Sequence, residues 1–79
     1  MRLDKYLKVS RLIKRRTVAA EACSAGKVSV NGKVQKASYD VKIGDILELT
    51  FGEKVIKLQV VSAQEFARKE DADSMYKPL

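Results

Sequence analysis

The sequence predicts an α+β domain: an N-terminal helix pair packed on a small, mainly antiparallel β-sheet, with a short C-terminal tail. Two observations predict this fold. Apolar residues recur at helical spacing up to Gly26, and from Val28 they alternate with polar residues as in half-buried strands. Asn31-Gly32 stands between two alternating runs, where it favours the type I′ turn of an antiparallel hairpin. Helices followed by hairpin-linked strands are typical of α+β folds.

The first predicted helix covers residues 2–13. The side chains expected to face the core share one side at helical spacing: Leu3, Tyr6, Leu7, Ser10 and Ile13. Basic side chains occupy most of the opposite side. Val9 and Leu12 interrupt that basic side, and they are candidates to pack against a later part of the chain. Residues 14–16, Lys-Arg-Arg, are expected to form the turn that follows.

A second helix is predicted over residues 18–25. Thr17 is its expected N-cap, because a threonine hydroxyl can accept a hydrogen bond from the free amides of the first turn. Gly26 is predicted to end the helix, since glycine tolerates the left-handed conformation that follows many helices. Four alanines make the helix thin, which lets its partner approach closely. Cys23 is expected to be a buried packing residue.

Four strands are predicted, at residues 28–30, 33–35, 46–51 and 54–61. The first two form the Asn-Gly hairpin, and Gly52-Glu53 turns the chain between the last two. A longer connection at 37–43 and a turn at Gly44-Asp45 separate the hairpins. Alternation points one set of side chains toward the helices: Leu47, Leu49, Phe51, Ile56, Leu58 and Val60. Two antiparallel hairpins under the helix pair are the simplest arrangement.

This pattern assigns one domain to residues 1–61. Residues 62–79 are more polar and are predicted to form a C-terminal tail, either a short helix or a partly mobile segment. The large apolar side chains of the tail include Phe66, Met75 and Tyr76, and Pro78 would end any helix there.

The net charge of +6 is concentrated at one end of the chain. Residues 1–16 contain seven lysines and arginines but one acid, whereas bases and acids balance in the rest. Such a cluster suggests a polyanionic partner, because lysine and arginine neutralise phosphates and release counterions. A solvated charged face is the alternative, which the scarcity of acids in this segment disfavours. Structured RNA is the expected partner, since it is read largely through shape, phosphates and 2′-hydroxyls.

The composition argues against an enzyme. The chain has no histidine, the commonest general base and metal ligand, and its single cysteine therefore lacks a partner for nucleophilic or zinc chemistry. No glycine-rich segment opens a helix as a phosphate loop would. We therefore expect no catalytic residue, no metal site and no cofactor. A single cysteine also excludes an internal disulfide, which fits a reducing cytosol.

Membrane association is not expected. The first residues lack the apolar core of a signal sequence, and no apolar run approaches the ~18 residues of a transmembrane helix. A basic amphipathic helix could lie on an anionic membrane, but Leu3, Leu7 and Ile13 are expected in the protein core. The predicted location is cytoplasmic.

Several spaced motifs within residues 1–61 resemble the RNA-binding domain named after ribosomal small-subunit protein S-four, of the αL type. They are Arg2-Leu3-Asp4-Lys5-Tyr6-Leu7, Arg15-Arg16-Thr17, Ala19-Ala20-Glu21, Gly26-Lys27-Val28, Val30-Asn31-Gly32, Lys36, Ser38, Val41 and Gly44-Asp45. The same domain accompanies catalytic domains in tyrosyl-tRNA synthetases and pseudouridine synthases. A stand-alone version is similar to the Hsp-fifteen heat-shock family. Residues 8–17, Met75-Tyr76 and the short tail make it more similar to the Firmicute-type ribosome-associated quality-control family RqcP.

This resemblance implies a bacterial, cytosolic, ribosome-associated protein that performs no chemistry. In that family the protein binds large ribosomal subunits that still carry peptidyl-tRNA after a stalled ribosome has split. It touches both large-subunit rRNA and the P-site tRNA, and it helps the tailing factor RqcH, with alanyl-tRNA, to extend the stalled chain with alanine. The chain is therefore expected to act as a monomer that holds the tRNA while the ribosome makes the bond.

The family motif maps six candidate RNA-binding residues onto the first helix and the turn after it: Arg2, Asp4, Arg11, Arg15, Arg16 and Thr17. Charge alone adds five more: Lys5, Lys8, Lys14, Lys33 and Lys36. Asp4 needs its own explanation, because an acid near phosphate is unfavourable. It could orient Arg2 or a turn arginine, cap the helix, or accept a hydrogen bond from a base or 2′-hydroxyl. It could equally be an ordinary acidic residue at the start of the helix, where the helix dipole favours a negative charge.

Two other functions stay open. A general RNA chaperone or ribosome-assembly factor would bind many structured RNAs with similar affinity and strong salt dependence. A protein-interaction adaptor would use the outer surface of the sheet, and it would keep its ribosome association after the basic side chains are removed. The fold class does not decide between them, because this domain is widely reused.

Overall fold

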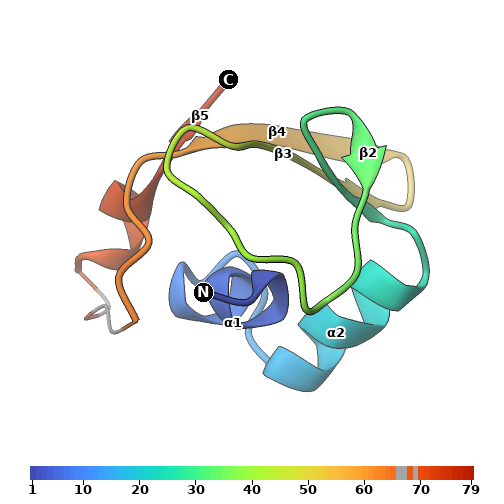
Figure 1. Cartoon of the computed structure of the whole chain (residues 1–79), viewed down its shortest axis with the longest axis horizontal. Coiled ribbons are helices and arrows are strands. Elements are labelled where there is room, and N and C mark those ends of the chain that lie inside the picture. Colours follow the sequence, from blue (N-terminus) through green and yellow to red (C-terminus); the bar gives the residue numbers. More distant parts are fainter. Residues whose placement is uncertain (66–67, 69) are drawn as a thin grey trace.

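The computed structural model describes residues 1–65, 68 and 70–79, which form two layers. Helices α1 (Leu3–Val9) and α2 (Arg16–Ser24) make one layer, and an antiparallel sheet makes the other (Figure 1). The strands are β1 (Val28–Val30), β2 (Lys33–Val34), β3 (Ile46–Phe51), β4 (Lys54–Val60) and β5 (Tyr76–Pro78), and a short 3-10 helix, η1 (Ala72–Met75), precedes β5. The predicted α+β class is confirmed. Within these described ranges, no helix is long and apolar enough to cross a membrane.

The sheet runs in the order β2-β1-β3-β4-β5, and every neighbouring pair is antiparallel. Both predicted hairpins are present, but β1 also pairs with β3 and so joins them into one sheet. Val30 lies opposite Leu47, and Leu47 lies opposite Leu58. All three side chains are buried, so this cross-strand row forms the floor of the core.

The core lies between the helices and the sheet. Its largest fully buried side chains from α1 and the central strands are Leu3, Tyr6, Leu7, Leu47, Leu49 and Leu58. Ala19, Ala22 and Cys23 are the buried residues of α2, and their small size lets the two helices pack closely. Cys23 is buried as predicted, and burial raises the pKa of its thiol.

The first helix is shorter than the sequence predicts. It ends at Val9 instead of residue 13, and Arg11 then takes a left-handed conformation with φ of 61°. The chain turns back, and the amide of Ile13 donates to the carbonyl of Leu7 over 3.1 Å. This turn returns the Ile13 side chain to the core, where it is 6% exposed. The helical spacing of apolar residues therefore indicated burial correctly, although the end of the run is not helical.

The start of α2 also differs from the prediction, because Thr17 is not its N-cap. The helix begins at Arg16, Arg15 is extended just before it, and no side chain caps the first turn. The carbonyl of Arg15 already accepts the amide of Ala19 in the helical pattern. Thr17 therefore lies inside the first turn, where its hydroxyl cannot play the part of a cap.

Two predicted chain reversals are confirmed. Gly26 follows α2 with φ of 75°, and the amides of Gly26 and Lys27 donate to carbonyls of the last turn, as in a Schellman motif. Asn31 and Gly32 have φ of 52° and 86°, and positive values at both positions are what the type I′ hairpin turn requires.

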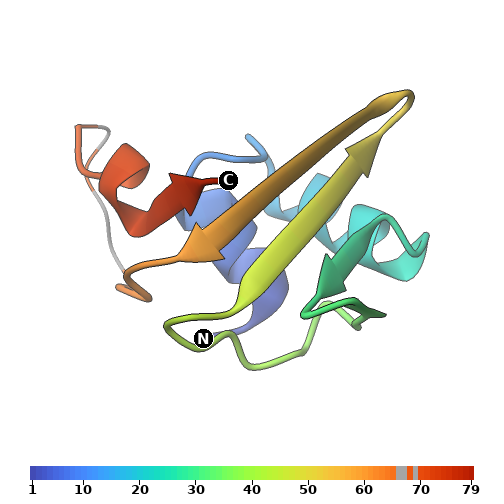
Figure 2. The ribbon, with the colours of Figure 1, turned by 90° about the horizontal axis from the view of Figure 1, so that it is seen from above.

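Phe51 and Ile56 are predicted in the core, but they are 38% and 40% exposed. Both lie toward the free end of the β3–β4 hairpin, which extends past the helix layer (Figure 2). Phe51 lines a shallow cleft with Val18 and Ala22 of α2. Alternation predicts the face of the strand correctly, but the helices cover that face along only part of its length.

Residues 70–79 add to the same fold. The short helix allowed by the sequence is present as η1, but the strand after it was not predicted. β5 pairs with β4 at the edge of the sheet, where Pro78 is tolerated because one side of an edge strand needs no amide donor. Met75 is 1% exposed. Phe66 lies outside the described residues, and the domain boundary at residue 61 stays a prediction.

Candidate nucleic-acid interface

A buried carboxylate joins two arginines from separate parts of the helix layer. The side chain of Asp4, in the first turn of α1, is 5% exposed. Its Oδ1 accepts from Nε of Arg2 at 3.1 Å and from the backbone amide of Lys5 at 2.8 Å. Its Oδ2 accepts from Nη2 of Arg2 at 3.3 Å and lies 3.5 Å from Nε of Arg16. Asp4 therefore links the residue before α1 to the first residue of α2.

The local fold places these three side chains together. Arg2 is extended before α1 and forms a β-bridge with Asp40. The amides of Leu3 and Asp4 then donate to carbonyls of the connection between β2 and β3, which fixes where α1 begins. An acid in the first turn is favoured by the positive end of the helix dipole. Arg16 reaches Asp4 because α2 starts against α1 and packs along it.

Electrostatics keep this cluster charged. Burial alone would raise the pKa of Asp4, but hydrogen bonds from Arg2 and the Lys5 amide, with the positive charges of Arg16 and Arg2, hold this pKa below its ordinary value. Two guanidinium groups therefore share one carboxylate at neutral pH, and a net positive charge remains. The side chains of Arg2 and Arg16 are 53% and 49% exposed. Each guanidinium has five N–H donors, more than Asp4 can accept, so both present donors to solvent.

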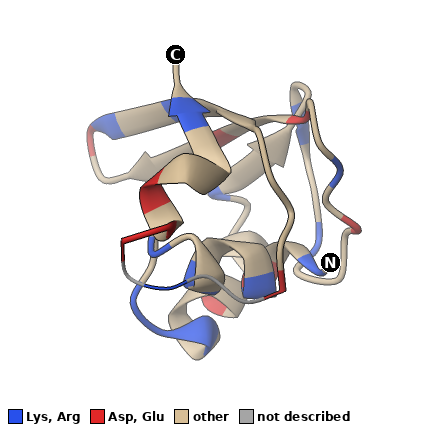
Figure 3. Cartoon of the chain, turned by 90° about the vertical axis from the view of Figure 1, so that its left-hand side faces the viewer, with Lys and Arg blue, Asp and Glu red and all other residues tan. Residues whose placement is uncertain are grey.

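A second group of bases, here called the basic turn, consists of Arg11, Lys14, Arg15 and Arg16. The first three are exposed between α1 and α2 (Figure 3). Among the residues whose structure is described, none of these three has a carboxylate within salt-bridge distance. Arg16 belongs both to the basic turn and to the Asp4 cluster. The structure thus places Arg2 and Asp4 at the start of α1 and Arg11 and Arg15 after its end, and Arg16 connects the two groups.

The other predicted residues are placed differently. Lys8 is exposed in the last turn of α1, whereas Nζ of Lys5 lies 3.4 Å from the carboxylate of Glu65, which offsets its charge. Thr17 is exposed in the first turn of α2, beside the basic turn. Lys33 lies on the edge strand β2, in the other layer, and Lys36 follows that strand. Contact with RNA by any of the predicted residues stays a prediction.

Sequence reasoning missed a cleft of about 650 Å³ between α2 and the residues that follow β2. Arg2 and Lys36 both line it, together with Cys23 and Ser24 of α2. These residues are far apart in the sequence, so no local pattern could indicate that they share a cleft. In the part of the chain that the structure describes, no cluster of His, Cys, Asp or Glu could hold a metal ion.

The chain is similar to known proteins in sequence and in fold. Residues 1–47 match the family described as the S4 domain. A protein of Halalkalibacterium halodurans named "RQC P-site tRNA stabilizing factor" is 53% identical over 76 residues, which cover 96% of this chain and 86% of that protein. A Bacillus subtilis protein of the same name is 54% identical over 76 residues, with coverage of 96% and 88%. The trimeric structure of Vibrio cholerae Heat Shock Protein 15 matches with a TM-score of 0.93 and 30% identity, covering 100% of this chain and 81% of that one.

Proposed function

The chain belongs to the S4 domain family, and within it to the RQC P-site tRNA stabilizing factors, and on this premise we propose that it binds and stabilises P-site tRNA during ribosome-associated quality control. It acts in the cytoplasm, on the ribosome, by binding alone. Its candidate interface consists of lysine and arginine side chains, which suit phosphate binding, and the sequence offers no histidine for acid–base chemistry.

The Arg2–Asp4–Arg16 cluster is the observation that carries this proposal. Asp4 fixes two guanidinium groups before any RNA arrives, so less side-chain freedom is lost when they bind. The free edge of each guanidinium can then grip a phosphate at two points. The oxygens of Asp4 are already occupied by Arg2, Arg16 and the Lys5 amide. Asp4 therefore acts by orienting the two arginines, and direct contact with RNA falls to them.

The proposal extends to large-subunit rRNA and to the tailing factor RqcH, as the resemblance of the sequence implies. Binding two RNAs at once requires two neighbouring cationic surfaces. The Asp4 cluster and the basic turn supply them, and Arg16 connects the two. RqcH benefits indirectly, because the peptidyl-tRNA held in the P site is the donor whose chain is transferred to the amino group of alanyl-tRNA. The monomer stays a prediction, and the trimer of the Vibrio cholerae protein is the alternative that sedimentation velocity would detect.

Co-sedimentation with large ribosomal subunits tests the proposed function. The subunits are prepared with and without peptidyl-tRNA and used at two salt concentrations. The native chain is compared with Arg16→Ala and with Arg68→Ala, which removes the same charge from an exposed position outside both basic groups. We expect the native chain and Arg68→Ala to prefer subunits that carry peptidyl-tRNA, and Arg16→Ala to lose this binding while it remains folded.

Three other outcomes separate the competing functions. Equal binding to both kinds of subunit, lost as salt rises and competed by unrelated structured RNA, would indicate a general RNA chaperone or assembly factor. Binding that survives Arg16→Ala but fails with substitutions on the outer face of the sheet would indicate a protein adaptor. A folded Arg16→Ala chain that still prefers the tRNA-bearing subunits would contradict the role given to Arg16.

A further inference from the structure

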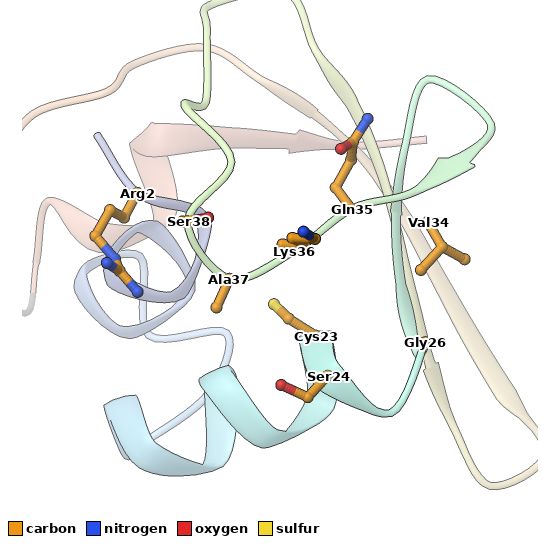
Figure 4. Close-up of a pocket in the computed structure, with 9 residues that line it drawn as sticks. All are labelled: Arg2, Cys23, Ser24, Gly26, Val34, Gln35, Lys36, Ala37 and Ser38. Atoms are coloured by element: carbon orange, nitrogen blue, oxygen red, sulfur yellow. The ribbon is translucent and has the colours of Figure 1, made fainter.

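We propose that the cleft between α2 and the segment after β2 is a subsite for one unpaired nucleotide of the bound RNA, an inference that rests on the proposed function. Figure 4 shows α2 as one wall of this cleft and the segment from Gln35 to Ser38 as the other. Arg2 stands at one end, and Val34 and Gly26 stand at the opposite end. The volume of about 650 Å³ lies within the range of clefts that hold small molecules.

The charges around the cleft favour an anion. Two cationic residues line it, Arg2 and Lys36, and no acidic residue does. Asp4 holds the guanidinium of Arg2 in place, and Lys36 has no carboxylate within salt-bridge distance in the described part of the chain. Lys36 is exposed, so its ammonium can reach a phosphate at the rim. The cleft therefore has a place for the phosphate of a nucleotide.

The walls suit a base and a ribose better than a phosphate alone. Val34 and Ala37 offer apolar surface against which the flat face of a base can lie, and the buried Cys23 also lines the cleft. Ser24 and Ser38 offer hydroxyls, which can pair with a base edge or with a 2′-hydroxyl. Ser24 is the last residue of α2 and Ala37 lies across from it, and the small size of both keeps the cleft open.

The shape of the cleft selects an unpaired nucleotide. Residues of α2 and residues 35–38 line opposite sides of the cleft, so a base placed between them would be unstacked and unpaired. Proteins that read particular RNA positions use unstacked bases in loops and bulges in this way. The inference therefore adds a position of local recognition to an interface that otherwise binds phosphates.

Two matched comparisons test the subsite. Lys36→Ala and Lys42→Ala remove the same charge from exposed positions in the connection between β2 and β3, but only Lys36 lines the cleft. Ser24→Trp fills the cleft without changing the charge, whereas Thr50→Trp adds the same bulk at an exposed position outside it. Affinity is measured for large subunits that carry peptidyl-tRNA. Chemical probing then compares the reactivity of unpaired rRNA and tRNA bases with each protein bound, and melting temperatures check the fold.

We expect Lys36→Ala and Ser24→Trp each to weaken binding about ten-fold. The first removes a charged contact to the phosphate, and the second fills the space that the base would occupy. Lys42→Ala and Thr50→Trp should stay within about two-fold of the native chain, since they alter only long-range charge or distant surface. The native protein should protect one unpaired base that the Ser24→Trp protein leaves reactive. If Ser24→Trp does not fold, two results still test the subsite: the difference in affinity between the two lysine variants, and whether the Lys36→Ala protein protects the unpaired base.

Equal effects of the two lysine substitutions, with a folded Ser24→Trp protein that binds normally, would overturn the subsite. This result leaves the proposed function standing if Arg16→Ala still abolishes the preference for tRNA-bearing subunits. Failure of the proposed function is distinct, because the native chain itself would then show no such preference.

Discussion

The hydroxyl of Tyr6 donates a 2.8 Å hydrogen bond to the backbone carbonyl of Met75, which lies 69 residues further along the chain. Both residues are buried, and burial raises the pKa of the Tyr6 phenol well above its ordinary range. The contact connects α1, which presents the Asp4 cluster, to the segment that enters β5. The end of the chain therefore supports the helix that carries the candidate interface.

Tyr6→Phe is expected to lower the free energy of unfolding by about 0.5–1.5 kcal/mol, because it removes one buried hydrogen bond while the carbonyl of Met75 still accepts from the amides of Val61 and Ser62. Urea unfolding measures this change through the shift of the midpoint at constant slope. Tyr76→Phe is the matched control, since the described residues supply no hydrogen-bond partner for its hydroxyl. Equal effects of the two substitutions would show that the Tyr6 hydrogen bond does not stabilise the fold.

Met75→Ala is expected to lower the free energy of unfolding by about 2–5 kcal/mol, the range for truncating a fully buried large side chain. Met75 is 1% exposed, and β5 follows it directly in the sheet. A chain that ends at residue 61 should be destabilised further, because it also lacks the partner strand of β4. Circular dichroism and urea unfolding test both. A fully stable 1–61 chain would show that the domain boundary predicted from the sequence is correct.

The sequence predicts what is local in this fold. The two helices, the Asn31-Gly32 turn and the end of α2 at Gly26 follow from spacing and turn chemistry that act over a few residues. The pairing of β1 with β3 and of β5 with β4 does not, because it joins segments that are distant in the chain. β5 is three residues long and contains Pro78, so its own sequence carries no strand pattern.

The candidate site likewise has features that the local sequence predicts and features that depend on contacts between distant segments. Motif and charge identify Arg2, Asp4 and Arg16 individually. They do not decide which of several roles Asp4 plays or which side chain it pairs with. The distances of Arg2 and Arg16 to its carboxylate depend on how α2 packs against α1, which no local pattern expresses. Lys36 is likewise identified by charge, while its place in the cleft with Arg2 depends on the path of the chain after β2.

Asp4→Asn is expected to change how stability depends on pH. The pKa of Asp4 lies below its ordinary value of 3.8 in the folded protein, so the ionised form stabilises the fold above that pH. This stabilisation is lost as the pH falls from 3.8 through the lower pKa of the folded state. Asp4→Asn removes that part of the pH dependence and weakens RNA binding, because Arg2 and Arg16 lose the charge that orients them. Urea unfolding between pH 7 and pH 2 measures the first effect.

Asp40 supplies the control for this experiment. The hydrogen bond and charge of the N-terminal ammonium lower the pKa of Asp40, so it also contributes to acid sensitivity, but it lies outside the basic groups. Asp40→Asn should therefore reduce the pH dependence while RNA binding is kept. If Asp4→Asn also keeps native RNA binding, then Asp4 does not position the arginines.

Arg11 is a non-glycine residue in the left-handed region, with φ of 61°, and it belongs to the basic turn. Such a conformation costs a residue with a Cβ about 1–2 kcal/mol. Glycine avoids this strain, but its greater freedom in the unfolded chain offsets part of the gain. Arg11→Gly should therefore raise the free energy of unfolding by about 0.5–1 kcal/mol, whereas Arg11→Ala should not, because alanine keeps the Cβ.

RNA binding should respond differently, because both substitutions remove the same guanidinium. We expect Arg11→Gly and Arg11→Ala to weaken binding to large subunits equally and to lower its salt dependence by about one phosphate contact. Titrations at several salt concentrations, beside urea unfolding of each variant, separate the two effects. A stability gain with unchanged binding would mean that the strained turn serves the path of the chain alone. Weaker binding beside a gain in stability would mean that the strain is kept because it places Arg11 on the RNA.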